Sequence, residues 1–159
     1  MAFACSIASW RIILKVDFYQ LAGSSVENVL PRIAERILGD AGRLLVVCED
    51  DPLAGRLDAC LWNYRPESFL PHGRTGQGDE ARQPILIAEG VGALNGARNI
   101  ALADGIWRDE ALDFERAFLF FADDRIAEAR EAWRDLGNRD DIERRFWKQD
   151  DAGRWTQAA

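Results

Sequence analysis

Two arginines one helical turn apart, with a tryptophan between them, form the clearest candidate for binding chemistry in this sequence. Arg130 and Arg134 are four residues apart, and Trp133 lies beside them. Two guanidinium groups at this spacing can hold a carboxylate while the indole accepts an apolar side chain. The simpler alternative is a solvated helix face, on which Glu128 and Glu131 pair with the arginines. The residues alone leave both interpretations open.

A second candidate is the apolar segment Pro-Glu-Ser-Phe-Leu-Pro-His, which runs from Pro66 to His72. Exposed Phe69 and Leu70 on a loop stiffened by prolines suit an anchor in a partner's groove. We therefore predict a docking loop of Phe69, Leu70, Pro71 and His72. The alternative is a loop that folds down onto its own core.

Candidate catalytic residues have few partners in the sequence. His72 is the single histidine, and a general base needs an orienting group and a nucleophile. Ser68 is close but has no strained elbow motif around it, so we interpret His72 as a residue that bonds backbone or lies at an interface. Asp50 and Asp51 follow a strand, where α/β enzymes place catalytic groups. Pro52 in the next helical turn favours a capping role for them instead.

Cofactor and metal motifs are also missing from the sequence. No phosphate loop precedes either lysine, and the glycines between residues 90 and 96 miss the dinucleotide spacing. Cys5, Cys48 and Cys60 show no ligand spacing, and we interpret Cys48 and Cys60 as small core residues. We expect no catalytic residue, no metal and no cofactor.

The segments that must position these residues alternate between strand and helix patterns. A helix from Ser24 would open with a capping box to Glu27, and one from Arg125 would be capped by Asp123 or Asp124. Residues 144–155 suggest a hairpin or a flap over the last helix. The expected strands are 16–21, 44–48, 84–88, 100–103 and 114–121, and the expected helices are 24–38, one following Asp50, and 125–136.

The apolar run from Leu44 to Cys48 has no alternation, which suits a strand covered on both faces of a parallel sheet. We predict a single α/β domain over residues 15–159, with a mostly parallel central sheet and flanking helices in three layers. Residues 1–14 are expected to be an N-terminal extension. Residues 63–83 are expected to form a long loop.

The overall composition limits the possible functions. The 159 residues carry a net charge of −7, which argues against sequence-independent nucleic-acid binding by the whole surface but leaves room for a local basic patch. No apolar stretch is long enough to span a membrane, and the N-terminus lacks a signal-peptide pattern. The odd cysteine count fits a reducing, cytoplasmic setting.

Several of these segments together resemble one known family, the chi subunit of bacterial DNA polymerase III holoenzyme. The resemblance runs in order from about Lys15 to Trp155. It departs from the family at Gln77, where an acidic residue is usual. The segments that carry it are Val16–Tyr19, Leu45–Asp50, Leu57–Asp58, Leu61–Trp62, Glu67–His72, Gly76–Gly78, Pro84–Ile87 and Phe146–Gln149.

The resemblance implies a Rossmann-like fold without catalytic activity of its own. It implies a link between the clamp loader and the acidic C-terminal tail of single-stranded DNA-binding protein, with mainly indirect DNA contact and no membrane. The family's tail site matches Arg130, Trp133 and Arg134, and its psi-facing loop aromatic matches Phe69. Psi, or an equivalent clamp-loader subunit, is the expected second partner. The alternative is an orphan Rossmann-like enzyme acting on a nucleotide or phosphorylated small molecule.

Overall fold

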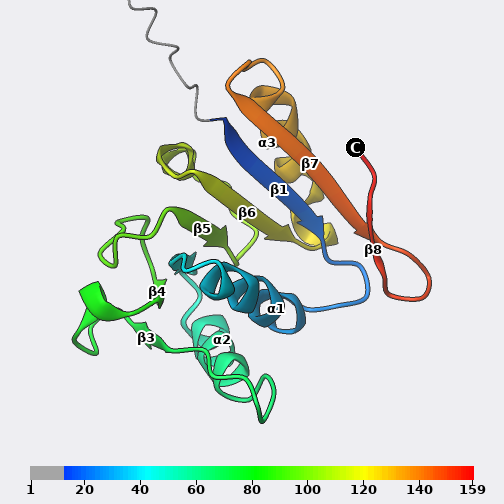
Figure 1. Ribbon diagram of the computed structural model, residues 1–159. Helices are drawn as coiled ribbons and strands as arrows, with labels where there is room; N and C mark the ends of the chain where they lie inside the picture. Colours follow the sequence, from blue (N-terminus) through cyan, green and yellow to red (C-terminus); the bar gives the residue numbers. More distant parts are fainter. Residues whose placement is uncertain (1–12) are drawn as a thin grey trace, which may run out of the picture.

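Eight strands form one central sheet in the computed structural model, which describes residues 13–159 (Figure 1). The strand order is β3-β4-β2-β5-β6-β1-β7-β8, and every neighbouring pair is parallel except β7 and β8. The mostly parallel sheet predicted from the sequence is therefore confirmed. The strands are β1 Leu14–Gln20, β2 Leu44–Val47, β3 His72–Arg74, β4 Ile85–Ala88, β5 Asn99–Leu102, β6 Arg116–Phe121, β7 Ile142–Gln149 and β8 Trp155–Gln157.

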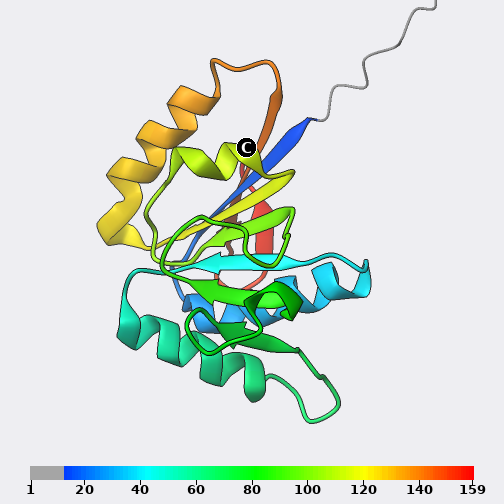
Figure 2. The same ribbon diagram turned by 90° about the vertical axis from the view of Figure 1, so that its left-hand side faces the viewer.

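In the described residues, three α-helices cover the two faces of this sheet (Figures 1 and 2). α1 (Val26–Gly39) and α2 (Asp51–Trp62) pack on one face, and α3 (Ile126–Leu136) packs on the other. The result is the predicted three-layer α/β arrangement. No helix in residues 13–159 is long and apolar enough to cross a bilayer.

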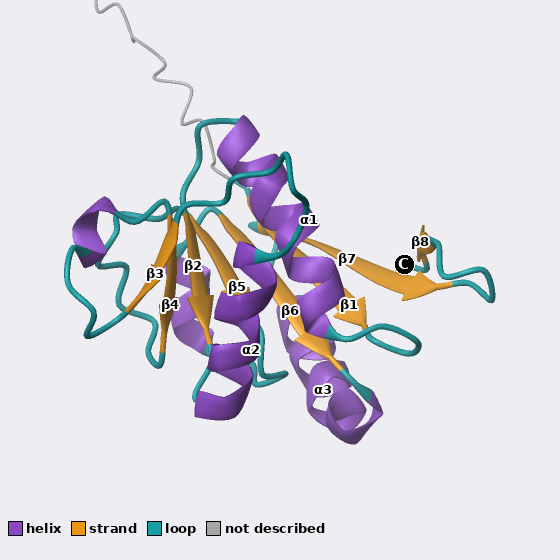
Figure 3. Cartoon of the chain, turned by 90° about the horizontal axis from the view of Figure 1, so that it is seen from below, coloured by secondary structure: helices purple, strands orange, loops and turns teal. Residues whose placement is uncertain are grey.

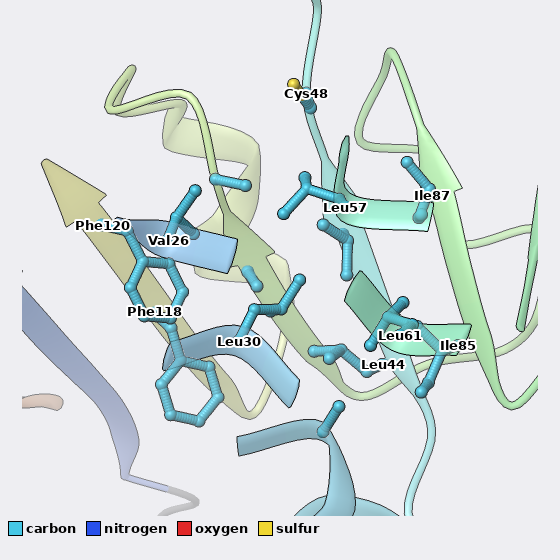
Figure 4. Packing of buried hydrophobic residues seen from close by; sticks show 14 of the residues in the cluster. Val26, Leu30, Leu44, Cys48, Leu57, Leu61, Ile85, Ile87, Phe118 and Phe120 are labelled. Atoms are coloured by element: carbon cyan, nitrogen blue, oxygen red, sulfur yellow. The ribbon is translucent and has the colours of Figure 1, made fainter. Parts of the chain in front are cut away.

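The structure of β2 explains why its sequence lacks alternation. Leu44 and Val46 pack toward α1 and α2, whereas Leu45 and Val47 pack toward the opposite layer, and all four are fully buried. Figure 4 shows Leu44 and Cys48 in the hydrophobic cluster that lies between the sheet and helices α1 and α2. Burial of each such aliphatic side chain contributes roughly 1.5–3 kcal/mol to the stability of the fold.

The predicted helix start is confirmed for α2, whereas the predicted starts of α1 and α3 differ from the structure. The Asp50 carboxylate accepts a hydrogen bond from Leu53 N, with proline in the first turn, as predicted. α1 begins after Ser25, so the capping box expected from Ser24 is wrong. Asp123 and Asp124 form a short 3₁₀ turn, and neither caps α3, which begins at Ile126.

Strand β3 and the parallel pairing of β7 with β1 were not expected from the sequence. β3 lies inside the predicted loop and pairs with β4 along the sheet edge. It was not predicted because its three residues are too few to show the alternation of apolar and polar residues typical of a strand. At the other edge, β7 and β8 form a hairpin, one of the two arrangements expected for residues 144–155, and β7 pairs in parallel with β1 (Figure 3). Alternate β7 side chains consequently face opposite layers. Residues 1–12 of the expected extension lie outside the described residues.

Candidate partner-binding sites

The arginine–tryptophan pattern of α3 lies beside a surface depression of about 220 Å³. Ile126, Arg130 and Trp133 form its helical wall, and Phe146 and Lys148 approach from β7. Residues 158 and 159 complete it: Ala158 N donates to the Phe146 carbonyl at 2.7 Å. The site thus has an apolar floor between two cationic side chains.

Trp133 is held rigidly at this floor. Its ring meets Phe18 and Phe146 edge to face, at centroid distances of 5.2 and 5.6 Å. The Arg144 guanidinium lies 4.2 Å from the ring centroid and also donates to the Trp133 carbonyl. A fixed ring loses little conformational entropy when a ligand packs on it.

The two α3 arginines carry charge that the described residues do not neutralise. Within residues 13–159, neither the Arg130 nor the Arg134 side chain forms a salt bridge or a hydrogen bond. Glu128 lies 3.8 Å from Arg125 instead. The paired face that the alternative interpretation requires is therefore not formed by these residues. Arg134 lies one turn beyond Arg130 and does not line the depression.

The docking loop exposes one of its four predicted residues strongly. Phe69 is 74% exposed, whereas Leu70 is 3% and His72 is 8% exposed. The expectation that Leu70 is exposed is wrong, because its side chain packs into the core beneath α1 and α2. Pro71, which lies between Leu70 and His72 in the sequence, is half-buried.

The loop is tied to both neighbouring helices, which fixes the position of Phe69. His72 Nδ1 lies 2.7 Å from the Leu70 carbonyl oxygen, and Nε2 lies 3.0 Å from the Asp58 carboxylate. Ser68 donates to Glu35 of α1 at 3.1 Å. His72 therefore has the backbone-bonding role expected for it, and Phe69 stands on an anchored support.

Groups at the carboxyl ends of the strands are engaged in structural contacts. Besides the Asp50 cap, Asp51 pairs with Arg74 at 2.7 Å, and Asp104 pairs with Arg108 at 2.8 Å.

Burial and two nearby carboxylates raise the pKa of Cys60 to about 12, so its thiol is a poor nucleophile at neutral pH. In the described part of the chain, no cluster of three metal-ligating side chains occurs.

Comparison with known proteins decides the family. The model of the family described as DNA polymerase III chi subunit, HolC, matches residues 14–141. The chain belongs to the DNA polymerase III chi subunit family. The chi resemblance seen in the sequence is therefore confirmed. The matched segment contains Arg130, Trp133, Arg134 and the whole docking loop.

Three relatives, each named DNA polymerase III subunit chi, support this assignment. The Escherichia coli protein is 35% identical over 95 residues, covering 60% of this chain and 63% of the relative. The Haemophilus influenzae protein is 28% identical over 96 residues (59% and 63%), and the Pseudomonas aeruginosa protein is 28% identical over 81 residues (49% and 57%). Each match spans less than two thirds of the relative.

Two further cationic residues lie beside the α3 site and were not predicted to belong to it. Arg144 and Lys148 follow the segment matched by the chi family model and come from β7 rather than α3. The sequence does contain a pattern that could have indicated them, because every second residue of a strand faces the same side. Arg144, Phe146 and Lys148 have this spacing. That spacing predicts that all three share one face of β7.

Proposed function

We propose that this chi-family chain is a non-catalytic accessory subunit that links the clamp loader to single-stranded DNA-binding protein. The observation that carries the proposal is the depression beside α3. It combines the unpaired Arg130 with the aromatic floor of Trp133. An acidic tail that ends in an apolar residue and a free carboxylate has complementary chemistry. Its apolar side chain packs on Trp133 while Arg130 and Lys148 receive the carboxylate.

Arg130→Ala and Trp133→Ala are each expected to weaken binding of such a tail by about tenfold or more. Loss of a charge-assisted hydrogen bond costs roughly 1.5–3 kcal/mol, and loss of the ring removes the apolar floor. Fluorescence anisotropy with a labelled peptide copying the tail of single-stranded DNA-binding protein measures the affinity. Arg134→Ala should have a smaller effect, because Arg134 lies outside the depression.

Arg98→Ala is the matched control, since it removes one positive charge from an exposed pair with Glu115. It should leave the affinity unchanged. Amidation of the peptide's C-terminal carboxylate should reproduce the Arg130→Ala loss. Equal affinity of wild type, Arg130→Ala and Trp133→Ala would remove the α3 assignment, and absence of wild-type binding would remove the proposed link.

The docking loop is proposed to meet the clamp-loader psi subunit or its equivalent through Phe69. An exposed aromatic on a support fixed by Ser68 and His72 is suited to insertion into a partner's groove. Because their side chains are buried, Leu70 and His72 contribute by holding the loop. Pro71 stiffens it.

Phe69→Ala is expected to weaken co-purification with the clamp-loader complex of the same organism, with about a tenfold lower affinity in biolayer interferometry. Leu94→Ala is the matched control, because Leu94 is another exposed apolar residue on a different loop. A loss in the Leu94 variant equal to that in the Phe69 variant would contradict a specific role for the loop.

A further inference from the structure

An arginine-rich cavity of about 510 Å³ lies on the opposite face of the sheet from Trp133. It is bounded by α1, by the strands β1, β6 and β7, and by the β7–β8 hairpin. Trp147 and Phe146 are neighbours on β7 and therefore point to opposite faces. The cavity is thus separate from the proposed tail site.

Four arginines from three elements converge on this cavity. Arg116 and Arg145 are both held by the buried carboxylate of Asp17, at distances of 3.1 and 2.8 Å. Arg32 and Arg36 lie one turn apart on the exposed side of α1, and neither forms a salt bridge within the described chain. One aspartate against four guanidinium groups leaves a local excess of positive charge in a chain of net charge −7. No carboxylate is among the described residues that line the cavity.

Three aromatic rings also line the cavity. Tyr19 stacks on Trp147 with centroids 6.0 Å apart and planes 12° apart, and Trp155 meets Tyr19 edge to face at 5.2 Å. All three residues are half-buried. Planar rings beside arginines are the combination by which proteins hold unpaired bases and their phosphates.

One polar atom at the cavity wall lacks a partner. Gln149 lines the cavity, and its Oε1 is buried without a hydrogen bond from the described residues. Its amide orientation is fixed, because Nε2 donates to Ser24 Oγ at 2.9 Å and to the Gly153 carbonyl at 3.2 Å. An occupant that brings an N–H group to Oε1 would satisfy it.

We propose that this cavity binds a phosphorylated nucleoside, either as a free nucleotide or as one unit of a nucleic-acid single strand. Arg32 and Arg36 receive the phosphate bidentately, and the base lies against Trp147 and Trp155. The volume lies within the range of small-ligand sites. This is the local basic patch that net charge alone left open.

The test is fluorescence anisotropy of the full chain with fluorescein-labelled twelve-residue oligothymidylate at low salt. The double variant Arg32→Ala/Arg36→Ala is expected to weaken binding at least tenfold and to flatten the salt dependence. Both side chains are exposed and form no salt bridge with residues 13–159, so circular dichroism should show an unchanged fold. The two single variants should give an intermediate loss of affinity. Arg98→Ala is the matched control, because it removes an exposed arginine that lines neither site, and it should retain full oligonucleotide affinity.

Competition identifies the source of the ligand. Displacement by dTMP or ATP at similar concentration assigns the site to free nucleotides, and displacement only by unlabelled oligonucleotide assigns it to single strands. Absence of wild-type binding to all of these probes overturns the proposal, as does equal binding by the double variant. It is also overturned if the double variant loses the acidic tail peptide but retains the oligonucleotide.

Discussion

Replacing Asp17 with alanine is expected to lower the free energy of unfolding by about 3 kcal/mol, a large share of the stability of a single domain. Asp17 is fully buried in β1, and its carboxylate accepts hydrogen bonds from Arg116, Arg145 and Trp147 Nε1. Removal of the acceptor leaves two guanidinium groups and an indole N–H without their partner. The arginine side chains remain 32% and 25% exposed, so water partly compensates.

Urea unfolding followed by tryptophan fluorescence measures this loss. Glu115→Gln is the control, because it also removes one carboxylate but from an exposed pair with Arg98, and exposed pairs contribute at most about 1 kcal/mol. A loss in Asp17→Ala no larger than in Glu115→Gln would show that the three donors find other acceptors. It would also mean that β1 and β7 are not joined through this carboxylate.

The second large effect is expected at Asp104, whose replacement by asparagine should cost about 2–3 kcal/mol at pH 7. Its carboxylate is only 6% exposed, pairs with Arg108 at 2.8 Å and accepts a hydrogen bond from Glu49 N at 3.1 Å. Burial alone would raise the pKa of Asp104. The hydrogen bonds from Arg108 and Glu49 N outweigh burial and hold this pKa below its usual range.

The sign of the pH dependence follows from that direction. A carboxyl whose pKa is lower in the folded than in the unfolded state stabilises the fold above its unfolded pKa, about 3.9. This stability is lost as the pH falls through the folded value. The stability difference between wild type and Asp104→Asn should therefore be full at pH 7 and shrink below about pH 4. Urea unfolding across a series of buffers from neutral to acid pH measures it, and a difference that grows toward acid would contradict the assignment.

Some helices and strands could be predicted from the sequence because their patterns lie within a single element. The apolar run of β2 indicated burial on both faces, and Asp50 with Pro52 indicated the start of α2. Both predictions were confirmed, since the apolar run and the capping pattern are each contained within a few consecutive residues. The Arg-x-x-Trp-Arg pattern likewise placed Arg130 and Trp133 on one side of a helix.

Contacts between distant segments could not be predicted in the same way. Whether Phe69 or Leu70 points outward depends on Glu35 and Asp58, which lie 33 and 14 residues from their loop partners. Lys148 reaches the α3 site only because β7 pairs with β1. The arginine cavity draws on residues as far apart as Tyr19 and Trp155, and no window of sequence contains it.

The position of β1 has a consequence for the order in which the chain folds during synthesis. β1 is made before both of its neighbours, β6 and β7, and Asp17 meets arginines 99 and 128 residues later. Pairings of such long sequence separation form slowly. The edges of β1 therefore stay without their native partners until β6 and β7 have left the ribosome. During that interval its backbone is open to association with other chains, so rapid completion of the C-terminal strands protects the nascent protein from aggregation.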